Sequence, residues 1–238
     1  MNNSRIIVSL DYSELDVTIA LASQLDPKSC RLKIGKELFT RFGPTVIEKL
    51  MNLGFDIFLD LKFHDIPNTV AGACKSAAKL GVWMINVHAL GGRKMLVAAS
   101  DAIKNSEHKP LLIAVTILTS MTNDDLKEIG INLTIEEAVI KLASISAKAG
   151  LDGVVCSALE VPLLRSKMDE KFCLVTPGIR PTGAEQNDQS RIVTPAKAII
   201  AGSDYLVIGR PITNATNPFM AIEAIQEEIN AALFQMKI

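Results

Sequence analysis

Residues 56–70 read DIFLDLKFHDIPNTV, and this stretch joins a short apolar run to a group of ionisable side chains. The apolar run has the length of a buried strand, and helical spacing of apolar residues begins at Val70. Asp60, Lys62 and Asp65 stand between the two. The stretch therefore predicts a buried strand that ends in charged residues and leads through a loop into a helix.

The same unit, a short apolar strand followed by a helix, recurs along the chain. The predicted strands are residues 5–10, 30–35, 56–61, 84–89, 111–118, 153–157, 173–178 and 205–209. Helical spacing is found in residues 15–25, 46–53, 70–80, 94–103, 135–149, 159–168 and 218–234. Strands that alternate with helices predict a parallel sheet whose strands are joined by helical crossovers.

An open doubly wound sheet and a closed barrel both satisfy this alternation. No G-x-G-x-x-G follows the first strand, where a dinucleotide-binding fold would have it. The 238 residues suit eight units, because (β/α)8 barrels have about 250 residues. We therefore expect a closed (β/α)8 TIM barrel, a single α/β domain over residues 1–238. The polar stretch RPTGAEQNDQSR, residues 180–191, is long for a strand-to-helix connection and is expected to be a mobile loop.

Composition excludes several classes of function. The chain has 25 basic and 26 acidic residues, so it has no basic excess with which to bind a nucleic acid. Neither a signal peptide nor an apolar run of membrane-spanning length is recognisable, and we expect a cytoplasmic protein without a membrane partner. The cysteines and histidines lack the spacing of a metal site: Cys30, Cys74, Cys156, Cys173, His64, His88 and His108. The cysteines fit reduced, mostly buried thiols better.

Polar residues recur where the predicted strands end. In a parallel barrel these carboxyl ends meet at one mouth, which is where catalytic groups lie. Most of the predicted strands contribute such residues: Asp11, Lys33, Asp60, Lys62, His88, Thr119, Ser120, Arg180 and Arg210.

Asp60 and Lys62 are two residues apart, so a regular strand would point both to the same face. Lys33, if it points inward from the neighbouring strand, would lie beside them. A structural ion pair between two strands would explain the D-x-K pattern by itself. However, buried ion pairs often give no net stability, so several ionised groups at one mouth are better explained by function.

A second constellation follows the last two strands. VTPGIR (175–180) and YLVIGRPI (205–212) each place a glycine before an arginine. Either pair alone would be typical of a surface arginine. Together, at the two strands that form the usual phosphate site of such barrels, they predict a phosphorylated substrate.

In these motifs the chain resembles the bacterial orotidine 5′-monophosphate decarboxylase family. DLKFHDIPNTV (60–70) has the family pattern D-x-K-x-x-D-I-x-x-T, although D-x-K-x-x-D alone is shared with sugar-phosphate decarboxylases. Further similar segments are VSLD (8–11), LKIGKELF (32–39), NVHALGG (86–92), AVTILTSM (114–121), VTPGIRP (175–181), DQSRIVTP (188–195) and DYLVIGRPI (204–212). The similarity extends in order from residue 5 to about residue 230.

The resemblance implies decarboxylation of orotidine 5′-monophosphate to uridine 5′-monophosphate, without a cofactor or metal. It implies that Lys62 protonates carbon six of the pyrimidine and that Asp60 lies beside the departing carboxylate. Lys33 would belong to the charged network and contact the ribose. Asp65, with Thr69 beside it, would cross the interface of a homodimer into the partner's site.

The resemblance also implies a set of substrate-binding residues. These would bind the ribose, the base and the phosphate, and Gln189 would bridge the loop and the phosphate: Asp11, Thr119, Ser120, Gln189, Arg180, Gly209 and Arg210. His64 and His88 are interpreted as structural. Two alternatives stay open, a metal-dependent decarboxylase of a β-keto sugar phosphate on the same scaffold and a non-catalytic phosphate-binding sensor.

Overall fold

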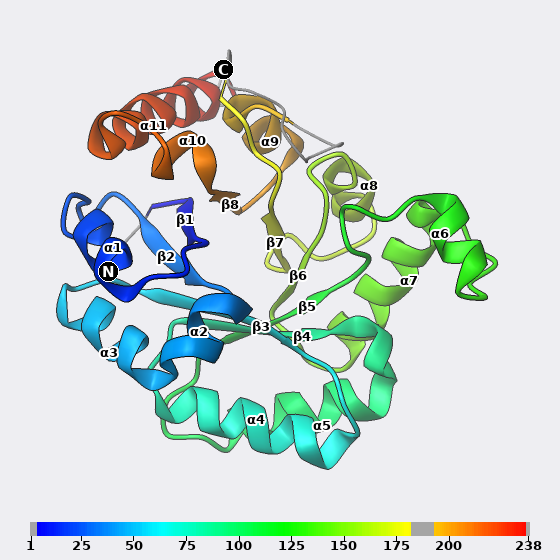
Figure 1. Cartoon of the computed structure of the whole chain (residues 1–238). Helices are drawn as coiled ribbons and strands as arrows, with labels where there is room; N and C mark the ends of the chain where they lie inside the picture. The colour runs from blue at the N-terminus through cyan, green and yellow to red at the C-terminus, as the bar shows by residue number, and fades with distance from the viewer. Residues whose placement is uncertain (1–3, 182–192, 237–238) are drawn as a thin grey trace.

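Eight parallel strands form a closed barrel in the computed structural model, which describes residues 4–181 and 193–236 (Figure 1). The strands follow one another around the barrel in chain order, and β8 pairs with β1 to close it. Their bounds are β1 Ile6–Leu10, β2 Arg31–Ile34, β3 Ile57–Phe63, β4 Met84–His88, β5 Leu111–Val115, β6 Gly153–Val155, β7 Cys173–Thr176 and β8 Tyr205–Ile208. The predicted fold class is confirmed, and each of the predicted strand ranges overlaps one observed strand.

Helices surround the barrel and connect its strands (Figure 1). Their bounds are α1 Leu15–Ala22, α2 Lys36–Phe42, α3 Pro44–Asn52, α4 Pro67–Lys79, η1 Ala89–Gly91, α5 Gly92–Lys104, α6 Asn123–Glu128, α7 Ile135–Lys148, α8 Val161–Arg165, α9 Pro195–Ala201, α10 Arg210–Thr213 and α11 Pro218–Gln235. The long helices were predicted from their spacing. The short helices α2, α6, α9 and α10 were not predicted, because they show little periodicity. The short helix α8 lies within the predicted segment 159–168. None of the helices in the described part of the chain is long and apolar enough to cross a membrane.

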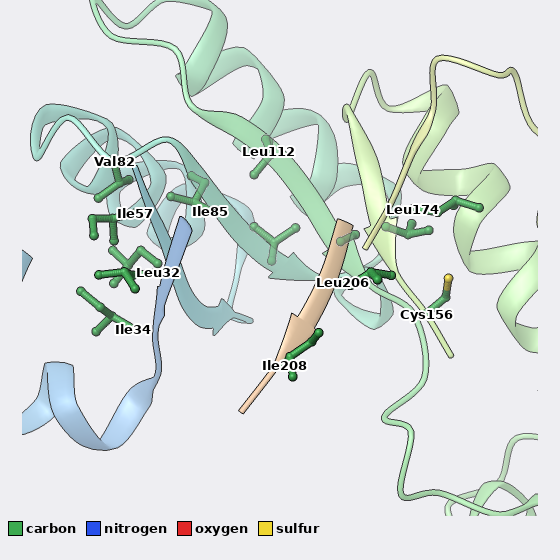
Figure 2. Close-up of a cluster of buried hydrophobic side chains, with 14 of the residues drawn as sticks. Leu32, Ile34, Ile57, Val82, Ile85, Leu112, Cys156, Leu174, Leu206 and Ile208 are labelled. Atoms are coloured by element: carbon green, nitrogen blue, oxygen red, sulfur yellow. The ribbon is translucent and has the colours of Figure 1, made fainter. Parts of the chain in front are cut away.

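Apolar side chains alternate between the two faces of the strands, as the period of a strand requires. The outward-facing residues form the larger core, between the barrel and its helices, and Figure 2 shows part of this layer around Leu32, Ile85 and Leu206. The inward-facing residues fill the barrel itself: Ile7, Phe58, Met84, Ile113, Val175 and Val207. Full burial of each such side chain contributes roughly 1.5–3 kcal/mol to the stability of the fold. Because these side chains fill the interior, the barrel has a packed core and not a pore.

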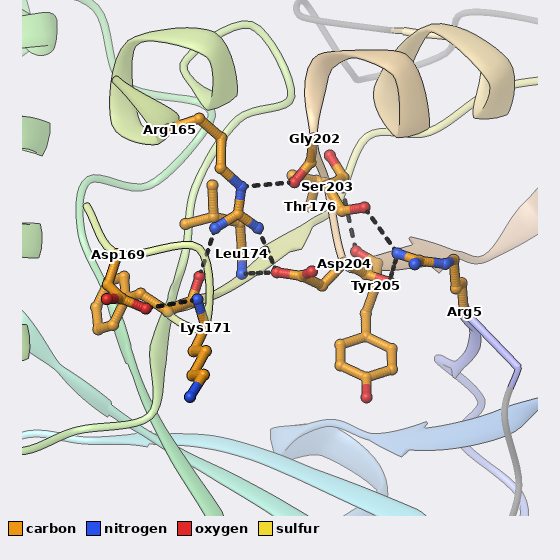
Figure 3. Close-up of polar contacts among 11 residues, drawn as sticks. Arg5, Arg165, Asp169, Lys171, Leu174, Thr176, Gly202, Ser203, Asp204 and Tyr205 are labelled. Carbon is orange, nitrogen blue, oxygen red and sulfur yellow. Dashed lines mark hydrogen bonds and ion pairs between the residues drawn. The ribbon is translucent and has the colours of Figure 1, made fainter. Parts of the chain in front are cut away.

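The amino ends of the last strands are held by a network around Arg165 (Figure 3). The guanidinium donates hydrogen bonds to the carbonyl groups of Gly202 and Phe172, at 2.9 and 2.7 Å, and forms an ion pair with Asp204. Arg5 donates to the carbonyl groups of Ser203 and Asp204 from the beginning of β1. These contacts tie α8, β7, β8 and β1 together at the end of the barrel opposite the predicted site.

Candidate active site

A cavity of about 630 Å³ opens at the carboxyl ends of the strands, above the apolar layer of the barrel. This volume is within the usual range for small-molecule sites. Eight of the residues predicted from sequence line it: Asp11, Lys33, Asp60, Lys62, Thr119, Arg180, Gly209 and Arg210. The strand ends thus bring together residues that are up to 199 positions apart, from Asp11 to Arg210.

Four charged side chains of alternating sign form a chain along one wall of the cavity. The Nζ atom of Lys33 lies 3.4 Å from Oδ1 of Asp11 and 3.1 Å from Oδ2 of Asp60. The Nζ atom of Lys62 lies 2.6 Å from the other oxygen of Asp60, Oδ1. Asp60 therefore holds both ammonium groups. The side chains of Lys33 and Asp60 are each 10% exposed, whereas that of Lys62 is 27% exposed and can meet a ligand.

The surroundings of Asp60 and Lys33 favour the ionised forms of both side chains. Burial by itself would raise the pKa of Asp60, but the ammonium groups of Lys33 and Lys62 and hydrogen bonds from Lys62 and Asn86 lower it to about 2. Burial would likewise lower the pKa of Lys33, yet the carboxylates of Asp60 and Asp11 outweigh it and the pKa is raised. At neutral pH the site therefore contains a carboxylate between fixed positive charges.

Strand β3 is irregular where these residues lie. Leu59 pairs with Ile85 and Phe63 with Val87, so the register between β3 and β4 shifts in the interval. Lys62 has a φ of 53°, the one positive φ of a non-glycine residue among those described. A left-handed residue costs roughly 1–2 kcal/mol, so surrounding contacts must hold it. The prediction that Asp60 and Lys62 project together holds for their side-chain ends, but simple alternation along a regular strand is not the reason.

Asn86 on β4 is a site residue that the sequence prediction missed. Its side-chain amide contacts both the carboxylate of Asp60 and the backbone N–H of Lys62. The signal was present, since Asn86 is a polar residue within the predicted strand MINVHA and is fully buried in the structure. A buried amide in such a strand requires partners on the neighbouring strand.

Two arginines lie at the other end of the cavity. Arg180 is 6% exposed, and its Nη1 donates to its neighbour's carbonyl group, on Ile179, at 3.1 Å. Its Nε is buried and has no hydrogen-bond partner within residues 4–181 and 193–236. Burial, and then the charge of Arg210, lower the pKa of Arg180. Two guanidinium groups that repel each other form a site that an anion such as a phosphate would stabilise.

Several predicted residues are not in the cavity wall of the single chain. Asp65 is exposed before α4, Thr69 is exposed in the first turn of α4, and Ser120 is exposed beyond Thr119. The Oδ1 of Asp65 accepts a hydrogen bond from the N–H of Ile66, whose side chain is 67% exposed. Gln189 and most of the predicted loop at residues 180–191 lie outside the described residues.

The two histidines of the motifs lie next to each other. The rings of His64 and His88 stack with their centroids 5.4 Å apart. Burial lowers the pKa of His88 to about 4, and the nearby charges of His64, Lys62 and Lys36 act in the same direction. His88 is therefore neutral at pH 7, so it adds no charge to the network. In the described part of the chain, His, Cys, Asp and Glu side chains do not gather in groups of three that could hold a metal ion.

A (β/α)8 barrel that has lysines and aspartates at its mouth, and arginines after β7 and β8, has the features of a barrel enzyme for a phosphorylated substrate. Comparison with known families gives a narrower assignment. The model described as "Orotidine 5'-phosphate decarboxylase / HUMPS family" matches residues 4–225, and the chain belongs to this family.

Curated relatives and a solved structure agree with this assignment. The chain is 57% identical over 233 residues to an orotidine 5'-phosphate decarboxylase of Nitrosomonas eutropha, covering 98% of this chain and 100% of the relative. It is 55% identical over 228 residues to that of Saccharophagus degradans, covering 96% of each. The crystal structure of orotidine 5'-phosphate decarboxylase from Lactobacillus acidophilus superposes with a TM-score of 0.85 at 42% identity, over 94% of this chain and 98% of that one.

Proposed function

We propose that this protein decarboxylates orotidine 5′-monophosphate to uridine 5′-monophosphate, the last step in making that pyrimidine nucleotide. The observation that carries the proposal is the shared carboxylate of Asp60, which holds the ammonium groups of Lys33 and Lys62 at one end of a cavity lined at the other by Arg180 and Arg210. The names of the relatives support the same reaction.

The chemistry explains why an ammonium group is needed. When the bond between carbon six and the carboxylate breaks, its electron pair stays in the plane of the ring, where the π system cannot delocalise it. A fixed positive charge beside carbon six would stabilise the developing carbanion. In the proposed mechanism Lys62 then gives its proton to carbon six, CO₂ leaves, and solvent reprotonates the amine.

The magnitude of a single charge interaction limits what the network can supply. Two unit charges about 4 Å apart interact by roughly 4 kcal/mol at an effective dielectric of about 20. An interaction of roughly 4 kcal/mol corresponds to about three decades of rate. It is smaller than the lowering of the activation free energy by roughly 8–23 kcal/mol that enzymes typically provide. The carboxylate of Asp60 beside the substrate's carboxylate adds a repulsion that the reaction relieves, and the remainder is assigned to the binding of the phosphate and ribose.

The phosphate would bind between Arg180 and Arg210, with the backbone of Gly209 close to it, and Asp11 and Lys33 would contact the ribose. Thr119 and Ser120 would lie near the base. The prediction that residues 180–191 close over the phosphate, with Gln189 as a bridge, stays a prediction. Binding energy from the phosphate would then hold the charged residues in their reactive arrangement.

We further propose a homodimer in which each chain supplies Asp65 and Thr69 to the site of the other. The support is that both residues are exposed and outside the cavity wall of their own chain, beside the 67% exposed side chain of Ile66. The proposed location is the cytoplasm, supported by four cysteines that form no disulfide.

An absorbance assay tests the function directly. The purified protein, incubated with orotidine 5′-monophosphate, should convert it to uridine 5′-monophosphate with and without EDTA. A protein that needs an added divalent metal, or that acts on a β-keto sugar phosphate instead, would overturn the proposal. So would a protein that binds the nucleotide without consuming it, as a sensor would.

A further inference from the structure

We propose that Asn86 is a positioning residue, whose amide sets the carboxylate of Asp60 and the backbone of Lys62 at the same time. The proposal rests on the proposed function, because it concerns the placement of the ammonium group that would protonate carbon six. Asn86 is not among the site residues predicted from the sequence. Its hydrogen bonds to Asp60 and Lys62 indicate the positioning role.

The first step is the break in the ladder between β3 and β4. The register shift between the pairs Leu59–Ile85 and Phe63–Val87 places the three residues 60–62 opposite the single residue Asn86. Such a bulge leaves backbone groups without their ladder partners. The N–H of Lys62 is one of these groups, and it donates to Oδ1 of Asn86 at 2.7 Å. The side chain of Asn86 thus replaces the missing backbone acceptor.

The second step is the other end of the same amide. Nδ2 of Asn86 donates to Oδ1 of Asp60 at 2.6 Å, the oxygen that also accepts from Nζ of Lys62. The orientation of the amide is determined by its partners, because a backbone N–H can only donate and an ionised carboxylate can only accept. Asn86 is fully buried, so water does not compete for either contact.

The third step is the consequence for Lys62. Its φ of 53° is unfavourable for a residue with a side chain, and the hydrogen bond from its N–H to Asn86 stabilises this conformation. The same conformation lets the side chain turn back, so that Nζ reaches Asp60 at 2.6 Å. One buried amide therefore fixes both the backbone and the counter-ion of the proposed proton donor.

Three substitutions test the contacts. Asn86→Leu removes both hydrogen bonds at similar volume. Asn86→Asp keeps an oxygen to accept from Lys62 but places a second acceptor against Asp60. Asn86→Ser is a smaller polar replacement that puts no additional bulk into the core around β4. The control is Ser146→Ala on α7, which removes a hydrogen bond from a fully buried side chain far from the site.

The experiment measures kcat and KM for orotidine 5′-monophosphate, Kd for uridine 5′-monophosphate, and Tm. We expect kcat to fall about 100-fold or more in Asn86→Leu and Asn86→Asp, since misplacing a reacting group by about 1 Å costs that much. The product's Kd should change by less than about threefold, because the phosphate and ribose contacts are untouched. Asn86→Leu and Asn86→Ser should also shift the acidic limb of the kcat profile to higher pH, since Asp60 loses a donor.

The outcomes are decisive in each case. A folded Asn86→Leu or Asn86→Ser protein with kcat within about threefold of the unsubstituted protein would overturn the positioning role. An equal loss of product binding and kcat, paralleled by Ser146→Ala, would show a purely structural role and overturn it as well. If Asn86→Leu does not fold, Asn86→Ser is judged by the same criteria. An unsubstituted protein without decarboxylase activity would refute the proposed function, a result distinct from active variants.

Discussion

Nζ of Lys62 lies 2.6 Å from Oδ1 of Asp60, and both residues lie in the part of β3 where its register with β4 shifts. The contact places the more exposed of the two ammonium groups against a carboxylate whose pKa its neighbours lower to about 2. Such an arrangement fixes the position of the amine before a substrate arrives, which is what a preorganised proton donor requires.

Replacing Lys62 by alanine should abolish turnover and leave nucleotide binding. We expect kcat for orotidine 5′-monophosphate to fall by at least about three decades, because one ion-pair interaction of roughly 4 kcal/mol is lost in the transition state. Calorimetric Kd for uridine 5′-monophosphate should change much less. Lys28→Ala, at an exposed lysine in the loop before β2, is the matched control and should retain full activity. A Lys62→Ala protein that still decarboxylates would rule out the proton-donor role.

The low pKa of Asp60 makes a prediction about acid stability. Its folded pKa of about 2 is below the ordinary 3.8, so the stabilisation is present above about pH 4 and is lost as the pH falls toward 2. The raised pKa of Lys33 acts at the other extreme, where stabilisation is lost only as the pH rises above about 10.5. Between these limits the ion pair is intact.

Urea unfolding at pH 5 and pH 3 measures the acid side of this dependence. From the linkage relation, Asp60 should account for about 1 kcal/mol of the unfolding free energy lost between these two pH values. Asp60→Asn should lack that part of the loss, whereas Asp101→Asn, at an exposed residue of α5, should keep it. Equal pH dependence in all three proteins would mean that Asp60 is not ionised by its neighbours as inferred.

The sequence was sufficient for the fold because the alternation of strands and helices repeats, and each repeat restates the same prediction. It was sufficient for the charged network because strand ends in a parallel barrel must converge. Asn86 was missed because its role depends on a bulge, and nothing in the D-x-K spacing predicts a positive φ at Lys62. The role proposed for Asp65 in a partner's site cannot be derived from the residues alone, because it depends on contacts with a second chain.

The phosphate end of the cavity should contribute to rate, although it is remote from the reacting carbon. Arg210→Ala should lower kcat/KM for orotidine 5′-monophosphate by two or more decades, since binding energy from the phosphate is used in the transition state. Turnover of orotidine, which lacks the phosphate, should rise when phosphite is added to the unsubstituted protein and rise much less in Arg210→Ala. Arg93→Ala on α5 is the control. If phosphite leaves orotidine turnover unchanged, the phosphate does not activate the site.

Mixing two inactive variants tests whether Asp65 acts in the partner's site. In the proposed homodimer, Lys62→Ala and Asp65→Ala chains that are mixed and allowed to exchange would form hybrids in which one of the two sites has both residues intact if Asp65 crosses the interface. Random exchange then restores about a quarter of the sites, because half of the dimers are hybrids and each has one intact site. If Asp65 served its own chain, every site would lack one residue and activity would stay at the level of the separate variants. Size-exclusion chromatography of the same mixtures checks that the chains are dimeric. The baseline is a mixture of the Lys62→Ala variant with a double variant that has both Lys62→Ala and Asp65→Ala, because no combination of those chains contains Lys62.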